Sequence, residues 1–421
     1  MYDAGTTGFM AVCAMLVFLM TPALAFFYGG LSRRKNVVNT MLMAFMVLGV
    51  TGVIWVAAGW SFAYGGDGSN PFFGGFDQLM CSSVIAEAIE NVPADDAAYP
   101  GIIDVGFQLA FAAITAAIIT GALAGRMKFS AVVAFIAIWG LVVYAPLAHM
   151  VWGGEGSFIG DTIGALDFAG GDVVHISSGL TGLVLCLLLG KRRGFGMMSY
   201  RPHNVPFVLL GTGLLWFGWF GFNAGSAFAA DAVAALALLN TMVAPAAAML
   251  AWMLVERLHT GNCTLVGACT GVVTGLVAIT PAAGFVDVWA AVLMGVITAP
   301  ICYFAIAFLK PRLGYDDALD AFGCHCVGGI VGGLLTGLFC VPELSWTDAG
   351  GLFYTGDATL LIAQLEGILV TVAFVAVASL VIGLVLKAVF GGLRVSANEE
   401  GEGLDARQHG ESAYPAFNGL D

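Results

Sequence analysis

Two histidines, His175 and His325, lie inside apolar, glycine-rich stretches of the sequence. An aspartate precedes each of them: Asp167 in DFAGGDVVHISSG and Asp320 in DAFGCHCVGGIVGG. An ionisable side chain inside a bilayer costs roughly 3 kcal/mol or more, and it normally faces a cavity, a partner or a conduction path. Two imidazoles that share one proton would suit a small solute that itself exchanges protons.

The elements that carry these histidines must lie in a membrane. Of the 421 residues, 59% are hydrophobic and 10% are charged, whereas a water-soluble domain of this size needs a more polar surface. About 20 apolar residues cross a bilayer as a helix, and the strict alternation of barrel strands is missing. We therefore predict an all-α polytopic membrane protein with eleven transmembrane helices. Their predicted centres are near Val17, Val47, Ala113, Ile136, Leu183, Leu214, Met249, Val273, Ile297, Val331 and Ala373.

The positions of the positive charges predict the orientation in the membrane. All 15 Lys and Arg residues follow an odd-numbered predicted helix, and such residues collect on the cytoplasmic side. We expect the N-terminus outside and the C-terminus inside, in the plasma membrane. The opposite loops carry carboxylates and no Lys or Arg, so the net charge of -13 is partly an acidic outer face that attracts cations. For most of these carboxylates a solvated loop surface is the simpler explanation.

Two unequal parts are predicted along the chain. Residues 1–390 form the membrane domain, and residues 391–421 form a short polar cytoplasmic tail that is too small for a core of its own. Predicted helices 1–5 and 6–10 make two blocks, with helix 11 added. Because five is odd, the first helix of the second block must begin on the opposite side of the membrane from the first helix of the first block. This is expected for a five-plus-five inverted repeat. His175 and His325 each fall in the fifth helix of their block.

Glycines surround both histidines, and small residues let helix backbones approach closely. Crossing of the two helices would bring the imidazoles together, with one donating and the other accepting a hydrogen bond. Both rings cannot be charged at once in so dry a place. Two other interpretations remain open: packing through bonds to a neighbouring helix, or a bis-histidine haem, for which close glycine packing leaves little room. Cys324 and Cys326 flank His325, but adjacent helix residues point in different directions, so we expect no metal site.

Aromatic residues gather toward the predicted outer side. Trp219, Phe222 and Ser226 stand at i, i+3 and i+7 of one predicted helix, and Trp152 ends another. A belt at the membrane interface is the alternative explanation, but a lipid-facing ring gains nothing from a neighbouring serine. Ring faces attract cations by roughly 0.5–2 kcal/mol, and a hydroxyl oxygen accepts hydrogen bonds. The pattern therefore predicts a site for a small cation that donates hydrogen bonds.

Below this site we expect Phe111 and Phe222 to close a mostly apolar pore that His175 and His325 line. Moving an unpaired ion into hydrocarbon costs on the order of tens of kcal/mol. Deprotonating an amine with a pKa of about 10.4 near neutral pH costs only roughly 4–5 kcal/mol. Such a path would pass an ammonium-like ion that sheds its proton and would reject potassium. Asp167 would either attract the cation and bias the proton step, or cap the free backbone N–H groups of the helix that follows it.

Together these motifs resemble the ammonium transporter/methylammonium permease/Rhesus family, in its prokaryotic branch. The matching strings run from the first predicted helix into the tail. They are FFYGGLSRRKNV, ALAGRMKFSA, AHMVWGG, GALDFAGGDVVHI, KRRGFG, PHNVP, GWFGFNAGSA, LVGACTGVV, DAFGCHCVGGIVG and EGLDARQHGESAY.

The resemblance implies a homotrimer whose protomers each hold a pore, with ammonium or ammonia as substrate. It also implies that the tail and inner loops bind a cytoplasmic PII-type signalling protein, and that Asp167 is the aspartate needed for transport. The other residues that it assigns are Phe111, Trp152 and Ser226 for the outer ammonium site, Phe111 and Phe222 for the gate, and His175, His325 and Trp219 for the pore.

The chain departs from the family pattern at a few positions. Asp172 stands where Thr or another uncharged residue is usual, Gly125 replaces a usual Glu, and Cys326 stands where Gly is common. We expect a transporter and not an enzyme, since no nucleophile–base set or cofactor motif is seen, and no cofactor, metal or nucleic-acid partner. The alternatives are an ammonium sensor with little flux and a passive ammonia gas channel.

Overall fold

The computed structural model describes residues 2–90, 97–197, 200–347 and 349–414. Within these residues, eleven helical spans are long and apolar enough to cross a membrane, and each predicted centre lies in one of them. The spans, with the helices they contain, are Ala4–Leu31 (α1), Arg34–Tyr64 (α2 and α3), Gly101–Leu123 (α5), Phe129–Trp152 (α6 and α7), Gly171–Leu189 (α8), Val205–Gly225 (α9), Ala232–Thr260 (α10), Leu265–Ala282 (α11), Val288–Leu313 (α12 and α13), Phe322–Phe339 (α14) and Thr359–Val389 (α16).

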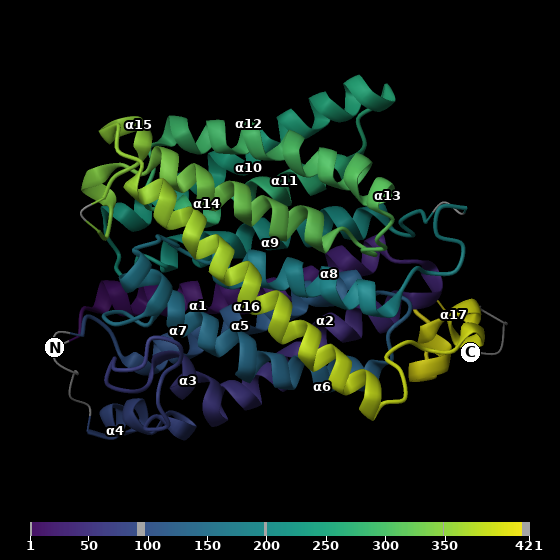
Figure 1. Ribbon diagram of the computed structural model, residues 1–421, viewed down its shortest axis with the longest axis horizontal. Helices are drawn as coiled ribbons and strands as arrows, with labels where there is room; N and C mark the ends of the chain where they lie inside the picture. The colour runs from purple at the N-terminus through teal and green to yellow at the C-terminus, as the bar shows by residue number, and fades with distance from the viewer. Residues whose placement is uncertain (1, 91–96, 198–199, 348, 415–421) are drawn as a thin grey trace.

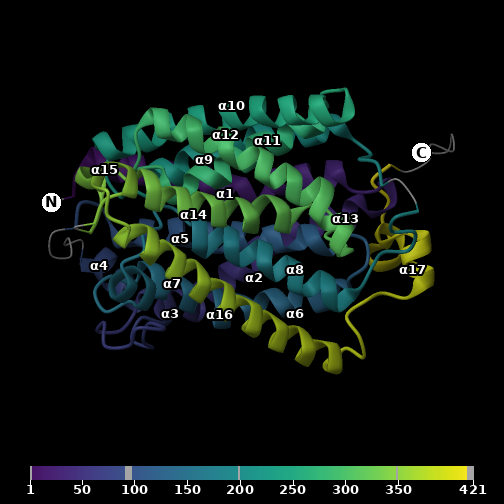
Figure 2. The same ribbon diagram turned by 45° about the horizontal axis from the view of Figure 1, so that its top comes forward.

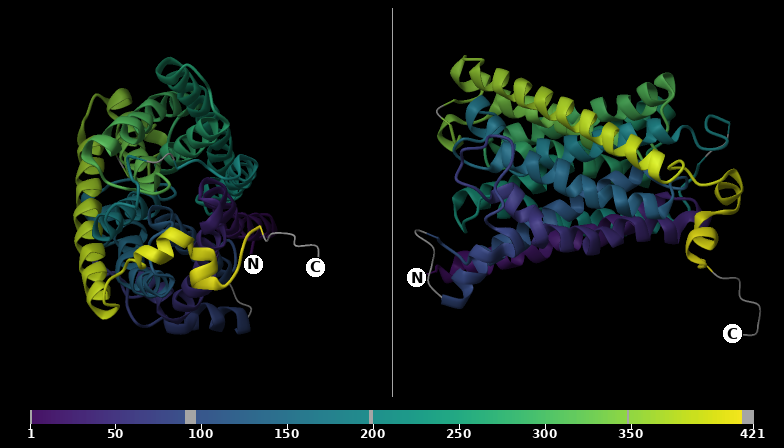
Figure 3. Two further views of the ribbon diagram at one scale, coloured as in Figure 1. Left: turned by 90° about the vertical axis from the view of Figure 1, so that its right-hand side faces the viewer. Right: turned by 60° about the horizontal axis from the view of Figure 1, so that its bottom comes forward.

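The spans lie side by side as an elongated bundle (Figures 1 and 2). The short helices α4 (Ser82–Glu90) and α15 (Leu352–Thr355) lie at the end of the bundle where α1 begins, and α17 (Ala397–Glu402) lies at the other end. The last span, α16, runs obliquely across one face of the bundle (Figures 1 and 3). Because the number of these spans is odd, the start of the first span and the end of the last span lie at opposite ends of the bundle.

The first helices of the two five-helix blocks, α1 and α9, run antiparallel in close contact. A Cβ atom at Gly211 of α9 would lie 2.4 Å from the backbone nitrogen of Phe27, near the end of α1. One at Gly225 would lie 2.8 Å from Cβ of Cys13, nearer the start of α1. Because only glycine fits at these points, the two backbones approach along most of their length. The blocks therefore begin with helices of opposite direction.

Irregularities at two places recur in both blocks, whereas the π-helical turn Trp55–Gly59 of the second span has no counterpart in the seventh span. A π-helical turn interrupts the fourth span at Gly140–Tyr144 and the ninth span at Ala305–Leu309. The fifth and tenth spans both begin with π-helical turns, Gly171–Ile176 and Phe322–Cys326. A π turn holds one extra residue and often marks a functional site. The turns Gly171–Ile176 and Phe322–Cys326 contain His175 and His325.

Buried charges tie the inner loops of the two blocks together. Asp316, in the loop before the tenth span, pairs with Nη2 of Arg192 at 2.6 Å and with Nη1 of Arg126 at 3.5 Å. Burial alone would raise the pKa of Asp316, but the bonds from Arg192 and the charge of Arg126 hold this pKa below its ordinary value. Arg126 is itself fully buried, so the pairing satisfies a charge that would otherwise be costly.

The described part of the tail, residues 391–414, lies against the inner ends of the first spans (Figure 3). Lys35 donates to the backbone oxygens of Glu400 and Gly401, and Asp405 Oδ1 accepts the backbone N–H of Asn39 at 2.8 Å. The tail therefore packs on the membrane part and forms no core of its own. The remainder of the predicted tail, residues 415–421, lies outside the described residues.

Candidate functional site

The two histidines predicted to pair are in contact at the centre of the bundle. Nδ1 of His325 lies 3.2 Å from Nδ1 of His175, and their ring centroids are 5.3 Å apart with an interplanar angle of 30°. Their exposed fractions are only 1% for His175 and 4% for His325. The two imidazoles thus form one buried unit.

Glycines permit this approach, as the sequence analysis expected. A Cβ atom on Gly179 of α8 would lie 2.5 Å from the backbone nitrogen of Cys326. One on Gly329 of α14 would lie 2.9 Å from the backbone oxygen of Gly171 and 3.2 Å from Cβ of His175. A side chain at either glycine would push the two helices apart and separate the rings.

The contact between the two Nδ1 atoms restricts the protons that the pair can hold. One Nδ1 must donate and the other must accept, so two neutral rings have opposite tautomers. Nε2 of His175 is buried and has no hydrogen-bond partner among the described residues. Burial in an apolar place opposes a second charge on the pair. The arrangement can therefore pass a proton between its rings, but it cannot hold two positive charges cheaply.

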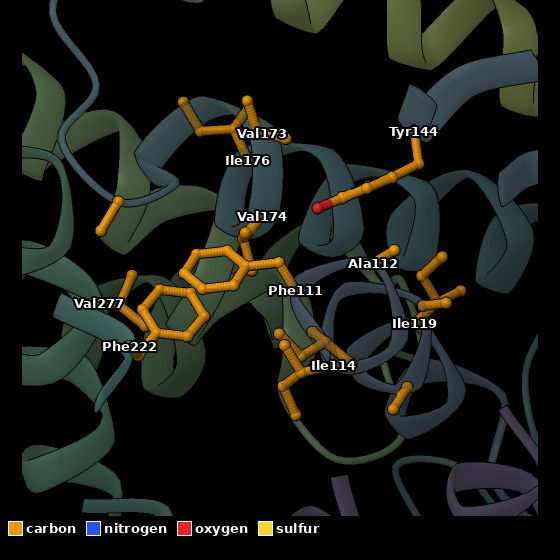
Figure 4. Packing of buried hydrophobic residues seen from close by; sticks show 14 of the residues in the cluster. Phe111, Ala112, Ile114, Ile119, Tyr144, Val173, Val174, Ile176, Phe222 and Val277 are labelled. Atoms are coloured by element: carbon orange, nitrogen blue, oxygen red, sulfur yellow. The ribbon is translucent and has the colours of Figure 1, made fainter. Parts of the chain in front are cut away.

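Two phenylalanines cover the histidines on the side that faces the end of the bundle where α1 begins. The rings of Phe111 (α5) and Phe222 (α9) are stacked, with centroids 4.0 Å apart and planes 17° apart, and they lie face to face in Figure 4. The Phe222 ring is 6.1 Å from the His175 ring. Trp219 stacks on His175 at 5.4 Å, and its indole N–H donates to Oγ1 of Thr280 at 2.9 Å. This bond fixes the orientation of the Trp219 ring beside the histidine.

On the same side of the phenylalanines lies a cavity of about 520 Å³, here termed the outer cavity, which Phe111, Trp152 and Ser226 line together. The Trp152 ring stands nearly perpendicular to that of Phe111, at 82° and 6.1 Å between centroids. The Ser226 hydroxyl donates to the backbone oxygen of Phe222 at 2.9 Å, so its own oxygen remains free to accept. The three residues predicted for the outer site are thus brought to one cavity floor.

Smaller cavities continue on the inner side of the phenylalanines. One of about 10 Å³ is lined by both histidines, Trp219 and Phe222, which is about the space that a single water-sized molecule needs. A second, of about 50 Å³, extends from His325 past Leu319 and Asp320. The Phe111–Phe222 stack stands between the outer cavity and the smallest cavity, and His325 borders both of the smaller cavities.

Asp167 caps the fifth span with its whole carboxylate. Its Oδ1 accepts the backbone N–H groups of Gly170 and Gly171 at 2.7 and 2.6 Å, and its Oδ2 accepts those of Asp172 and Val173 at 2.8 and 3.3 Å. Its backbone oxygen accepts the indole N–H of Trp152 at 2.8 Å. Asp167 also borders the outer cavity, but its oxygens are already occupied. Of the two roles considered for it, the geometry favours capping and positioning.

The second block has a carboxylate that matches Asp167, in addition to Asp320 in the sequence before His325. Asp317, not Asp320, precedes His325 by the same number of residues as Asp167 precedes His175. Oδ2 of Asp317 accepts the backbone N–H of Phe322 at 2.7 Å, whereas Asp320 pairs with Lys310 at 2.5 Å. Burial raises the pKa of Asp317 to about 6, against the opposing charge of Lys310.

The family departures have different surroundings. Asp172 is 7% exposed, and its Oδ1 has no hydrogen-bond partner in the described part of the chain. Gly125 has φ of +80°, and a Cβ there would lie 2.7 Å from Nδ2 of Asn36, so glycine suits this position on both counts. Cys326 packs against Gly179 at the helix crossing.

Sequence reasoning missed further polar residues of the outer cavity. Asp104 and Gln108 of α5 and Tyr64 of α3 line it together with Phe111. The signal was available in the sequence, because residues 104, 108 and 111 stand at i, i+4 and i+7 and so share one helix face.

Apolar spans around a line of cavities, with a buried histidine pair and an aromatic constriction, define a multi-pass membrane transport protein. The profile of the Ammonium Transporter Family matches residues 8–414. The chain belongs to this family, as its sequence motifs predicted, and it is therefore a transporter and not an enzyme.

Individual relatives agree with this assignment. An ammonium transporter of Aquifex aeolicus (strain VF5) is 49% identical, over 98% of this chain and 94% of the relative. One of Bacillus subtilis (strain 168) is 45% identical, over 97% and 98%. Among solved structures, Saccharomyces cerevisiae Mep2 gives a TM-score of 0.85 at 35% identity, with 94% of this chain and 88% of that chain covered. A sensor Amt protein gives 0.87 at 27% identity, with 96% and 98% covered.

Proposed function

We propose that this ammonium transporter works as a channel that carries its substrate past the gate as ammonia. Ammonium binds at the floor of the outer cavity, loses a proton near the Phe111–Phe222 stack, and crosses beside His175 and His325 as a neutral molecule. The observation that carries this proposal is the buried histidine pair, 3.2 Å apart, directly beneath the stacked phenylalanines.

The outer site suits a cation that donates hydrogen bonds. The ring faces of Trp152 and Phe111 attract positive charge, each by roughly 0.5–2 kcal/mol, and the Ser226 oxygen accepts an N–H. Asp167 orients the Trp152 ring, because its backbone oxygen accepts the indole N–H. Its carboxylate oxygens already accept backbone N–H groups. We therefore assign Asp167 to the support of the site and not to direct contact with ammonium.

The gate and the narrow cavity reject ions. At 4.0 Å between centroids, the Phe111 and Phe222 rings leave no space between them, so passage requires a ring to rotate, as side chains do on fast timescales. Beyond them, the cavity of about 10 Å³ gives a charged species no water shell. The proton either follows along the histidine pair or stays outside, and this choice decides whether transport is electrogenic.

The wider arrangement is also part of the proposal. The Lys and Arg distribution supports an outer N-terminus and an inner C-terminus. The antiparallel α1 and α9, with matched π turns in both blocks, support a five-plus-five inverted repeat. We further propose a homotrimer, with residues 1–390 as the membrane domain and residues 391–421 as a regulatory tail. The tail contacts Asn39 of α2 and Arg193 of the loop after the fifth span, and this surface would receive a PII-type protein.

Purified protein in liposomes tests the mechanism. We expect the wild type to give an ammonium-evoked current and an ammonia flux. The variant with both His175→Ala and His325→Ala should reduce the current at least tenfold. His259→Ala is the matched control, since His259 bonds Tyr303 at 2.8 Å and borders none of the cavities described above.

The other outcomes identify the alternatives. Ammonia flux without current in the wild type would indicate a passive gas channel. Tight ammonium binding with neither current nor flux would indicate a sensor, which is the second candidate because of the structural likeness to the sensor Amt protein. Equal currents from the wild type and the double histidine variant would contradict the proposed role of the pair.

A further inference from the structure

The wall of the outer cavity carries buried oxygen atoms without partners. Oδ1 of Asp104, Oε1 of Gln108 and the hydroxyl of Tyr64 are each buried and have no hydrogen-bond partner among the described residues. All three residues line the cavity of about 520 Å³. Gln108 is 5% exposed. A buried acceptor left unsatisfied costs about 1–3 kcal/mol, so several of them in one cavity wall indicate a ligand that satisfies them.

These oxygens lie outward of the aromatic site, on one path toward it. Asp104, Gln108 and Phe111 share a face of α5, and seven residues of helix place Asp104 about 10 Å along the axis from Phe111. Tyr64 ends the second span. Tyr99 lines the same cavity as Asp104.

The chemistry of the three groups selects the ligand. A carboxylate and an amide oxygen are acceptors, and a phenol hydroxyl can accept as well. An anion would be repelled by Asp104, and an apolar molecule would leave every oxygen unsatisfied. A small cation with several N–H groups satisfies all of them, and charge-assisted bonds to a carboxylate are the strongest that it can make.

We propose that Asp104, Gln108 and Tyr64 form a capture site where ammonium binds before it reaches Phe111, Trp152 and Ser226. This site deepens the proposed function and rests on it. Asp104 provides the charge, and Gln108 and Tyr64 accept the remaining N–H groups. Ammonium stays protonated here, because its deprotonation belongs to the aromatic constriction farther in.

A capture site of this kind affects concentration dependence more than maximal rate. It raises the occupancy of the cavity at low ammonium, while the steps at the gate and the histidines stay the same. Loss of the site should therefore raise the half-saturating ammonium concentration and leave the maximal current nearly unchanged.

Ammonium-evoked currents in liposomes, measured over a range of concentrations at constant ionic strength, test the site. We expect Asp104→Asn to raise the half-saturating concentration about tenfold, equivalent to about 1.4 kcal/mol. Tyr64→Phe and Gln108→Met should each raise it about threefold, since a neutral hydrogen bond is worth less. The matched control is Asp161→Asn, because Asp161 lines the same cavity but is exposed and already accepts the N–H of Gly156 at 2.9 Å.

Several results would overturn the capture site. Equal shifts for Asp104→Asn and Asp161→Asn would mean that only the general charge of the cavity matters. No shift in the Asp104, Gln108 and Tyr64 variants would mean that no site exists. A lower maximal current with an unchanged half-saturating concentration would indicate a structural defect. If Asp104→Asn does not fold, Tyr64→Phe and Gln108→Met decide the question alone.

The capture site and the proposed mechanism can fail separately. Normal histidine-variant results with an unshifted Asp104→Asn would remove the capture site alone. If the wild type carries no current, calorimetric titration of the purified protein with ammonium chloride still tests the site. Weaker binding by Asp104→Asn than by Asp161→Asn would then support it, and equal binding would reject it.

Discussion

Asp172, which is expected to depart from the family pattern, is a buried carboxyl group one helical turn before His175. Its backbone N–H is held by Asp167, but its Oδ1 has no hydrogen-bond partner in the described residues. Oδ2 is directed toward α16, where a Cβ on Gly367 would lie 4.0 Å from it. An unsatisfied buried acceptor costs about 1–3 kcal/mol, so this residue lowers stability at the place where it stands.

Replacement of this carboxyl group should stabilise the protein. A threonine in the helix can bond a carbonyl of the preceding turn, and we expect Asp172→Thr to raise the free energy of unfolding by about 1–3 kcal/mol. Thermal unfolding of the purified protein measures this change. Asp161→Thr, at an exposed aspartate, should change it by less than about 0.5 kcal/mol. A lower melting temperature for Asp172→Thr would show that the carboxyl group has a stabilising partner.

The sequence revealed some site residues more readily than others, for physical reasons. His175 and His325 stand out because an ionisable group in an apolar span is expensive. Asp104 did not stand out, because a carboxylate in the first turn of a helix has an ordinary explanation in the helix dipole. Oδ1 of Asp104 lacks a hydrogen-bond partner because of how the folded helices surround it, and no local sequence pattern indicates this.

At the scale of elements, the fifth and tenth spans each begin at a buried aspartate whose carboxylate accepts backbone N–H groups of the first turn. Asp167 accepts four backbone N–H groups in a buried place, and Asp317 accepts that of Phe322. The first N–H groups of a helix have no partner within the helix. These carboxylates therefore fix where the histidine-bearing helices begin.

Loss of the first cap should be costly. We expect Asp167→Ala to lower the free energy of unfolding by about 3–5 kcal/mol, since several buried N–H groups lose a charged partner at once. Asp167→Asn should cost less, because its amide oxygen still accepts. Asp231→Ala is the control: Asp231 caps α10 at the surface through one bond, to the N–H of Ala234 at 2.9 Å, and its loss should cost about 1 kcal/mol. Similar melting temperatures for the two alanine variants would contradict the role of Asp167.

Hydropathy predicted the number and approximate centres of the spans, because burial in lipid requires long apolar runs. It did not predict the π turns at Gly171–Ile176 and Phe322–Cys326, since an extra residue in a turn leaves composition unchanged. For the same reason the sequence drew attention to Asp320 before His325, whereas Asp317 is the carboxylate that caps the tenth span. Asp317 and Asp320 are equally plausible caps by type, and only the start of the tenth span distinguishes them.

At the scale of the whole molecule, the tail joins segments far apart in the sequence. Asp405 holds the N–H of Asn39, and the His409 ring packs edge-on against Phe129 with centroids 4.9 Å apart. Nε2 of His409 lies 2.9 Å from Nδ2 of Asn39. The tail thus touches the inner ends of the second and fourth spans, and a histidine stands at that contact.

Docking of the tail should therefore depend on pH. Burial lowers the pKa of His409 below its ordinary value of 6.5, against the opposing charges of Asp405 and Glu411. At pH values between 6.5 and the lowered pKa of His409, the undocked tail binds more protons than the docked tail. Docking is consequently strongest above this pH range and weakens as the pH falls through it.

Hydrogen exchange of the tail amides, corrected for the intrinsic effect of pH, measures this dependence. We expect residues 397–409 to be less protected at about pH 5.5 than at about pH 7.5, with the change centred near or below the ordinary histidine pKa. His409→Gln keeps a polar side chain of similar reach and should remove most of the change, while His259→Gln, far from the tail, should not. Protection that rises on acidification would mean that His409 is docked in its charged form, held by Asp405 and Glu411. Constant protection would mean that docking does not depend on the protonation of His409.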